Sequence, residues 1–146
     1  MTIKAIMSEF CERNGIAYDP ENGGGTVSLR VGDDTVLIVP GVANDELNVL
    51  AAIGEPTTGG PEAFERLMLE ANMQLAVHGD ATLSFDNESG VYVVVETVSA
   101  DGLDADVLRD AVANVVALKD DWKERLGNSC STAAEGSSAG NVVIKA

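Results

Sequence analysis

Apolar residues recur with the period of a helix in three segments of this chain, residues 2–14, 63–76 and 104–126. In each segment they lie three and four positions apart, which places them along one side of a helix. Leu69 and Met73 lie off the stripe of the second segment, which indicates that this helix is covered on two sides, by its own sheet and by another subunit. The side chains that we expect to form the core stripes of the second and third helices are Phe64, Leu67, Met68, Ala71 and Leu75, followed by Leu108, Ala111, Val112, Val115, Leu118, Trp122 and Leu126.

Five other segments have the spacing or composition of β-strands: residues 26–31, 35–39, 46–53, 82–85 and 91–98. The first alternates apolar and polar side chains, which is the period of a strand with one buried face. A short turn joins it to the second, so we expect the first three strands to form an antiparallel meander. The second and the last segments are apolar on both faces, and we therefore expect both faces of these strands to be covered.

The elements follow one another as helix, three strands, helix, two strands and helix. This order predicts an α+β fold in which an antiparallel sheet packs against helices. We expect residues 1–126 to form one domain, because a chain of this length buries about 68–70% of the surface that its unfolded form exposes. Residues 127–146 are rich in Gly, Ser and Ala, a composition typical of a flexible tail.

The balance of charges narrows the range of partners. The chain has 24 acidic and 9 basic residues, a formal net charge of −15. Nucleic acid and anionic membrane surfaces are polyanions, so we expect neither as a partner, whereas solubility or a basic partner is favoured. No stretch of 18 apolar residues occurs, so we expect no membrane insertion. Lys119, Lys123 and Arg125 lie near the C-terminal end of the third helix, where the helix dipole favours positive charge.

The cysteines and the first residues of the chain indicate a compartment. Cys11 and Cys130 lie far apart, which is neither a disulfide framework nor the spacing of a metal site, and suits a reducing cytosol. The first residues lead directly into a helix that contains acidic side chains, without the apolar core of a signal peptide. We therefore expect the protein to be cytoplasmic.

The chain carries no constellation of residues that would support catalysis. The single histidine, His78, has no partner for a metal site or a catalytic triad. Cys11 lies beside the stripe of the first helix and next to acidic residues, so we expect a small buried hydrophobe. Residues 101–106 lack the spacing of a calcium loop, and Asp104 is better explained as a helix N-cap. We expect no catalytic, cofactor-binding or metal-binding residues and hence no enzyme.

The order of the elements resembles that of the class I type III secretion chaperones, the Tir chaperone family. The resemblance covers residues 1–126 and is carried most clearly by FERLMLEAN (64–72), GDATLSFD (79–86), DGLD (101–104) and the final helix with Trp122. It implies a cytoplasmic homodimer of α+β subunits. Such a chaperone binds a segment near the N-terminus of a secreted effector, keeps it extended and soluble, and aids its delivery to the export apparatus. It acts without ATP, cofactor or catalysis.

The resemblance also implies where this chain binds its partners. In the family the second helix and the strands after it build the dimer interface, and the positions left over here by the core stripe are Leu69, Met73, Val91, Val93 and Val95. The first helix and the first sheet would bind the effector, which can add a strand to a sheet edge. The candidates for this contact are Val27, Leu29, Val36, Leu37, Ile38, Leu47, Val49 and Leu50, and for each of them core packing is the stronger alternative.

Two other classes of function stay open at this stage. The same layers suit an acidic regulatory or inhibitor module that binds a folded partner, whereas the client of a chaperone stays extended and sensitive to protease. An enzyme built on scattered acidic residues is a third reading, which a bound metal or cofactor would support.

Overall fold

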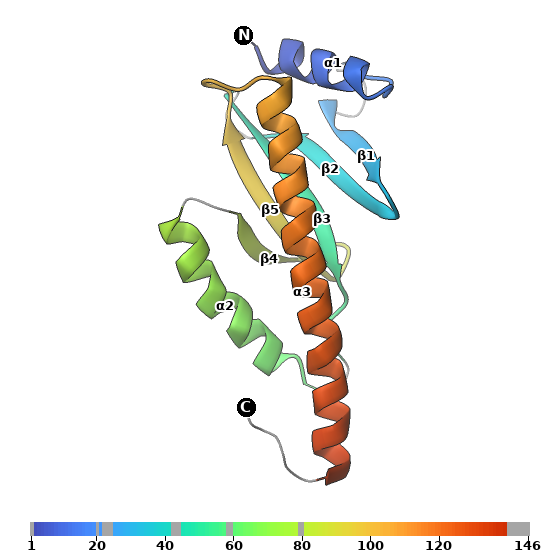
Figure 1. Ribbon diagram of the computed structural model, residues 1–146, viewed down its shortest axis with the longest axis vertical. Coiled ribbons are helices and arrows are strands. Elements are labelled where there is room, and N and C mark those ends of the chain that lie inside the picture. Colours follow the sequence, from blue (N-terminus) through green and yellow to red (C-terminus); the bar gives the residue numbers. More distant parts are fainter. Residues whose placement is uncertain are drawn as a thin grey trace.

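The computed structural model of the chain describes residues 2–19, 21, 25–41, 45–57, 60–78 and 81–139, with side chains up to residue 128. Within these residues the predicted α+β class and the predicted order of elements are confirmed. Figure 1 labels the elements, which are α1 (Ile3–Arg13), β1 (Val27–Val31), β2 (Asp34–Pro40), β3 (Glu46–Gly54), α2 (Glu62–Val77), β4 (Thr82–Asp86), β5 (Val91–Ser99) and α3 (Ala105–Ala139). None of the described helices is long and apolar enough to cross a membrane.

The strands form one antiparallel sheet in the order β1-β2-β3-β5-β4. The meander predicted for the first three strands is confirmed, and the two-residue turn between β1 and β2 contains Gly32, whose positive φ of 63° suits such a turn. The last strand in sequence, β5, lies between β3 and β4, so the short β4 becomes an edge. A register shift between Ala52 and Gly54 marks a bulge in β3, where a side chain on Gly54 would meet Leu126 at 2.9 Å.

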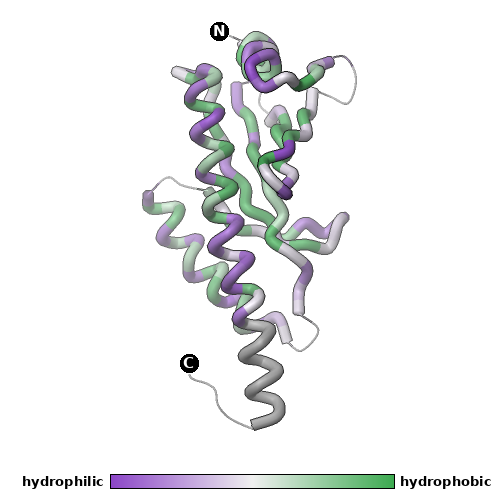
Figure 2. The backbone as a smooth tube through the Cα atoms, turned by 45° about the vertical axis from the view of Figure 1, so that its right-hand side comes forward, coloured by the Kyte–Doolittle hydropathy of each residue, from purple (hydrophilic) through white to green (hydrophobic). Residues whose placement is uncertain are grey.

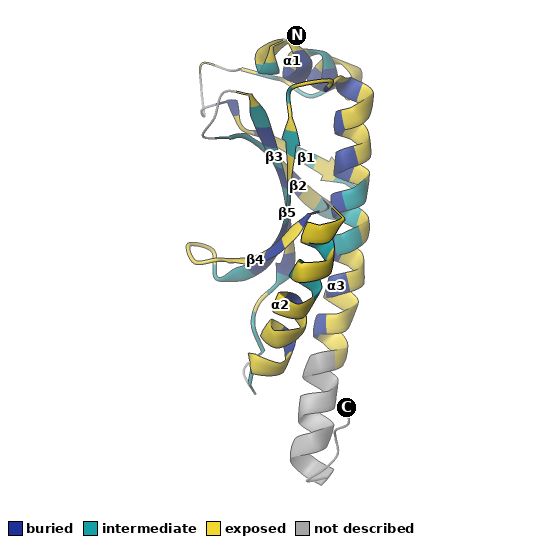
Figure 3. Cartoon of the chain, turned by 90° about the vertical axis from the view of Figure 1, so that its left-hand side faces the viewer, coloured by how far each residue is buried: buried dark blue, intermediate teal, exposed yellow. Residues whose placement is uncertain are grey.

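The helices lie on one face of the sheet. α3 crosses β3 and β5, α2 packs over β4, and α1 lies at one end next to the start of α3 (Figures 1 and 3). Figure 2 shows that the central strands are mostly hydrophobic, whereas hydrophobic and hydrophilic residues alternate along α2 and α3. No described element covers the opposite face, which we call the open face. The expectation that both faces of β2 and β5 are covered is therefore not met within a single subunit.

Side chains cap α1 and α3 at their N-termini. The hydroxyl of Thr2 accepts a hydrogen bond from Ala5 N–H at 3.2 Å, and the carboxylate of Asp104 accepts one from Val107 N–H at 2.8 Å. The second contact confirms the prediction that Asp104 is a helix N-cap. α3 also continues to Ala139, beyond the end at residue 126 that the periodicity predicts. The domain boundary at 126 and the tail of 127–146 stay predictions.

One predicted core position is exposed, and one position missing from the stripes is buried. Leu67 is 43% exposed, because α2 turns Phe64 and Met68 toward the sheet and leaves Leu67 at its flank. On α3, Leu118 is half-buried and packs against the core, and Lys119 beside it is fully buried. The stripe that faces the sheet is thus Leu108, Val112, Val115, Lys119, Trp122 and Leu126.

Candidate protein-binding surfaces

The edge strand β4 is partly closed by a side chain of α2. Asn72 donates from Nδ2 to the carbonyl oxygen of Leu83 at 2.9 Å and accepts at Oδ1 from the N–H of Leu83 at 2.8 Å. These two backbone groups face away from β5, so they belong to the outer edge of the sheet. A strand added at this edge cannot bond to Leu83 unless Asn72 is displaced.

The other edge strand, β1, has no comparable cover among the described residues. Gly41 N–H donates to the carbonyl oxygen of Glu46 at 2.9 Å, so odd-numbered residues of β2 bond toward β3 and even-numbered ones toward β1. The odd-numbered residues of β1 pair with these even-numbered residues. Ser28 and Arg30 therefore turn their N–H and C=O groups toward the free side, where an extended segment can pair with them.

Two surfaces of different character flank this free edge. On the helix face, Leu29 and Val31 are only half-buried, because α3 lies over β3 and β5 and leaves the region in front of β1 uncovered (Figure 1). On the open face, the side chains of Ser28 and Arg30 are exposed. Side chains of a strand alternate between faces. The edge thus suits an extended segment whose apolar residues alternate with polar ones.

The open face carries an apolar band across the middle of the sheet. Leu37 pairs with Leu50, and Leu50 pairs with Val95, so these three side chains form a row across β2, β3 and β5. Val93 and Ala52 form the next row. Leu37 is 39% exposed, and Leu50 and Val95 are half-buried. A contiguous apolar surface of this kind is a feature of protein-binding sites.

The structure separates the eight residues predicted to contact an effector into two groups. Leu29, Leu37 and Leu50 lie at the surface, the first beside the free edge and the others in the apolar band. The other five lie in the core of the subunit and are not offered to a partner there; they are Val27, Val36, Ile38, Leu47 and Val49. The alternative of core packing thus accounts for these five.

A row of large apolar side chains lies on the outer side of α2. Leu69, Met73 and Val77 are spaced four residues apart and are 72%, 70% and 72% exposed. Phe85 on the neighbouring strand β4 is 46% exposed, with its ring 5.7 Å from that of Tyr92. We call these four residues the α2 row. Val77 and Phe85 are absent from the predicted interface, although Val77 continues the spacing of Leu69 and Met73.

The residues predicted for a dimer interface do not lie on one face of the sheet. Leu69 and Met73 project from the outer side of α2, which covers the helix face. Val91, Val93 and Val95 alternate with Tyr92, which contacts Phe64 of α2, so their side chains point to the open face. An interface that includes both groups has to wrap around the β4 edge.

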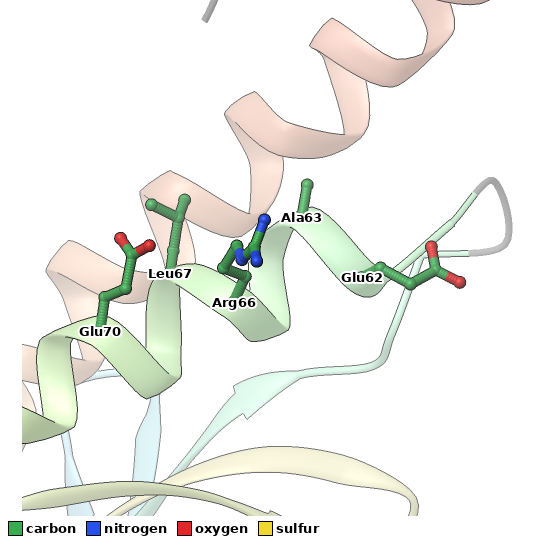
Figure 4. Close-up of a pocket in the computed structure, with 5 residues that line it drawn as sticks. All are labelled: Glu62, Ala63, Arg66, Leu67 and Glu70. Atoms are coloured by element: carbon green, nitrogen blue, oxygen red, sulfur yellow. The ribbon is translucent and has the colours of Figure 1, made fainter.

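A shallow cavity of about 440 Å³ lies along α2 beside the α2 row. Its described lining consists of Glu62, Ala63, Arg66, Leu67 and Glu70, and Figure 4 shows Ala63 and Leu67 pointing from α2 toward α3. The exposure of Leu67 thus belongs to this groove. Its charged rim and small apolar floor suit contact with a protein surface more than enclosure of a small ligand.

The described residues bring no reactive groups together. They contain no group of three His, Cys, Asp or Glu side chains that could hold a metal ion. Cys11 is 1% exposed, and burial raises the pKa of its thiol, which favours the unreactive protonated form. The arrangement is equipped to bind extended or apolar protein segments.

Comparison with known proteins places this geometry in context. Residues 5–123 match the Tir chaperone protein (CesT) family. No curated protein is significantly similar to the chain in sequence.

Several solved complexes have a fold similar to that of this chain. The ExsC–ExsE complex matches with a TM-score of 0.69 at 19% identity over 86% of this chain and 97% of that chain. The HopA1–SchA chaperone–effector complex matches with a TM-score of 0.67 at 17% identity over 83% and 92%. The ExoU–SpcU complex from the type III secretion system of Pseudomonas aeruginosa matches with a TM-score of 0.63 at 14% identity over 81% and 95%. At these identities the matches show a shared fold.

Proposed function

Because this chain belongs to the Tir chaperone protein (CesT) family, we propose that it is a type III secretion chaperone. It binds the N-terminal region of an effector protein, keeps that region extended and soluble, and aids its delivery to the export apparatus. The observation that carries the proposal is the family match over residues 5–123, and the contrast between the closed β4 edge and the free β1 edge supports it. An extended client can pair with an edge of this kind.

The client segment adds to the sheet as a further strand beside β1. Its backbone pairs with the outward groups of Ser28 and Arg30, which each offer one donor and one acceptor. Alternate client side chains pack against Leu29 and Val31 on the helix face. The others lie beside the polar side chains of β1 on the open face, and apolar residues that reach further contact Leu37. Main-chain pairing tolerates many sequences, whereas the apolar contacts set which segment binds.

The net charge of −15 contributes to the choice of client. A negative surface attracts segments with an excess of Lys and Arg and speeds their association at low salt. It also keeps the chaperone soluble while apolar surface is exposed. We propose in addition that the protein works in the cytoplasm, without catalysis or cofactor, and binds neither nucleic acid nor membrane.

The same proposal includes a homodimer formed through the α2 row. A two-fold interface buries the same patch on both subunits, and an outer helix face with large apolar side chains is suited to such pairing. Sedimentation equilibrium tests this. The combined substitutions Leu69→Glu and Met73→Glu should give a monomer, whereas Val107→Glu, which charges an exposed residue of α3, should not. A wild-type protein that is monomeric at micromolar concentration contradicts the dimer.

A proline at Ser28 tests the proposed edge. The N–H of Ser28 points to the free side and takes no part in the ladder with β2, so an edge strand tolerates proline there. Ser28→Pro should keep the fold and thermal midpoint but weaken binding of the client segment by about tenfold or more, because one hydrogen bond is lost and the added strand is obstructed. Ser28→Ala, which keeps the N–H, is the control and should bind as the wild type does.

Two results, the binding of Ser28→Pro and the state of the bound partner, separate the possible functions. Equal binding by Ser28→Pro and wild type excludes the β1 edge as the client site. A partner that is folded and protected from protease over most of its surface favours the alternative of an acidic regulatory or inhibitor module, a class that the high negative charge also suits.

A further inference from the structure

A lysine occupies a core position of α3. Lys119 lies four residues after Val115 and three before Trp122 in the stripe that faces the sheet, and it is 2% exposed. A fully buried lysine is rare and requires a paired negative charge. Its partners are Asp120, the next residue of α3, and Asp34, at 2.6 Å from Nζ to Oδ2. The lysine side chain is thus buried, and its ammonium group meets two carboxylates at the margin of the core, Asp34 and Asp120, which are 27% and 62% exposed.

The partner Asp34 belongs to the hairpin that presents the free edge. It is the first residue of β2 and pairs with Val31, the last residue of β1, across the two-residue turn. Among the described residues, its contact with Lys119 is the only hydrogen bond or ion pair between the β1–β2 hairpin and α3. α3 otherwise packs mainly on β3 and β5 (Figure 1).

The lysine is charged under ordinary conditions. Burial acts to lower the pKa of Lys119, but the hydrogen bonds and charges of Asp120 and Asp34 outweigh it and raise the pKa above its usual value. The contact with Asp34 is therefore an ion pair. Desolvation offsets much of the attraction of a buried ion pair, so an apolar residue of equal size is often as stable, and in some proteins such a pair instead specifies one arrangement of the elements it joins.

We propose that Lys119 is a positioning residue for client binding: its ion pair with Asp34 holds the β1–β2 hairpin against α3 and keeps the β1 edge in the orientation that accepts an added strand. The inference rests on the proposed function, since it assumes that β1 is the client edge. Without the ion pair, the hairpin is joined to α3 by apolar contacts alone and opens more often. The edge then has to be ordered again when the client binds, which weakens binding.

The test compares Lys119→Met with wild type, because Met is an unbranched side chain only one atom shorter than Lys and carries no charge. The control Arg109→Met removes an exposed cation from the same helix, whose ion pairs within the described part of the chain are with Asp106 and Asp110. Amide hydrogen exchange of the free protein is followed at Leu29 and Val31, and affinity is measured for the client segment recovered with the chaperone. Lys119→Met should speed exchange at these two amides on the order of tenfold, the scale of one charged hydrogen bond.

The client affinity of Lys119→Met should fall in proportion to the population that the closed hairpin loses, with exchange in the central strands and the thermal midpoint near wild-type values. Unchanged exchange and affinity overturn the inference. Exchange that accelerates equally in β3 and β5 also overturns it, because it shows a loss of global stability. If Lys119→Met does not fold, Asp34→Asn carries the same test, since it leaves Lys119 paired with Asp120.

Failure of the inference and failure of the proposed function give different results. If wild type binds no effector segment, the proposed function is wrong, and the exchange rates at Leu29 and Val31 still decide whether the ion pair holds the hairpin. If wild type and Lys119→Met bind equally well, the chaperone function stands and the positioning role is wrong.

Discussion

Replacement of Asn72 by alanine removes both hydrogen bonds between α2 and the outer edge of β4. The bonds, of 2.9 and 2.8 Å, join one side-chain amide to the N–H and C=O of Leu83 in a partly buried site. A typical protein hydrogen bond contributes about 1 kcal/mol net, so the loss of two should cost about 2 kcal/mol. For a chain of this size that corresponds to a fall of roughly 4–8 °C in the thermal midpoint.

Urea denaturation and thermal melting measure the cost, and amide exchange at Leu83 locates it. Asn48→Ala is the matched control, because Asn48 accepts one exposed hydrogen bond from the Thr97 hydroxyl and its loss should cost less than about 1 kcal/mol. Asn72→Asp should destabilise at least as much as Asn72→Ala, since it keeps the acceptor for Leu83 N–H but sets a carboxylate against the Leu83 carbonyl oxygen. If Asn72→Ala is no less stable than Asn48→Ala, the account of the β4 edge is refuted.

Three further predictions concern the core. Phe64→Ala should lower the free energy of unfolding by about 3–5 kcal/mol in urea titrations, because Phe64 is fully buried with its ring 4.9 Å from Tyr92 and 5.7 Å from Trp122; a cost below about 1 kcal/mol would contradict this packing. The peptide that contains Cys11 should stay unmodified by iodoacetamide in the native protein and react in urea, and rapid native labelling would show that the thiol is accessible. Burial, and then the hydrogen bond to Glu65, raise the pKa of Tyr92. The neutral phenol therefore stabilises the fold fully below about pH 10, and this contribution is lost as the pH rises further. The thermal midpoint should therefore fall above about pH 10, and the slope should be smaller in Tyr92→Phe; an equal slope in both proteins would exclude Tyr92 as a cause.

The fold could be predicted because each element carries its own local signal. Local signals of this kind are the helical spacing of Phe64 and Met68 and the alternation of apolar and polar residues in β1. In the structure Phe64 and Met68 are buried on one side of α2, and burial alternates along β1. The insertion of β5 between β3 and β4 depends on contacts between distant segments, which no local spacing reports. Strands that are apolar on both faces likewise do not reveal whether an element of the same subunit covers the second face, and here no described element does.

The positions missed in the sequence have a common physical cause. Its charge places Lys119 at the helix end, whereas the structure buries it because Asp34 approaches from a distant hairpin and, together with the neighbouring Asp120, pairs with its charge. Asn72 resembles any polar residue of an exposed helix until β4 brings the backbone of Leu83 against it. Among the predicted effector contacts, apolar character alone did not distinguish buried Val36 from exposed Leu37, although the two are adjacent in β2.

Capture of the tagged protein from its native host, followed by limited proteolysis of the partner and amide exchange of the chaperone, tests the central claim most directly. The account predicts one dominant partner that is protected only over a segment near its N-terminus. The chaperone in that complex should gain protection at the outward N–H groups of Ser28 and Arg30. A folded partner that is protected over most of its surface, with the exchange of β1 unchanged, would contradict the account.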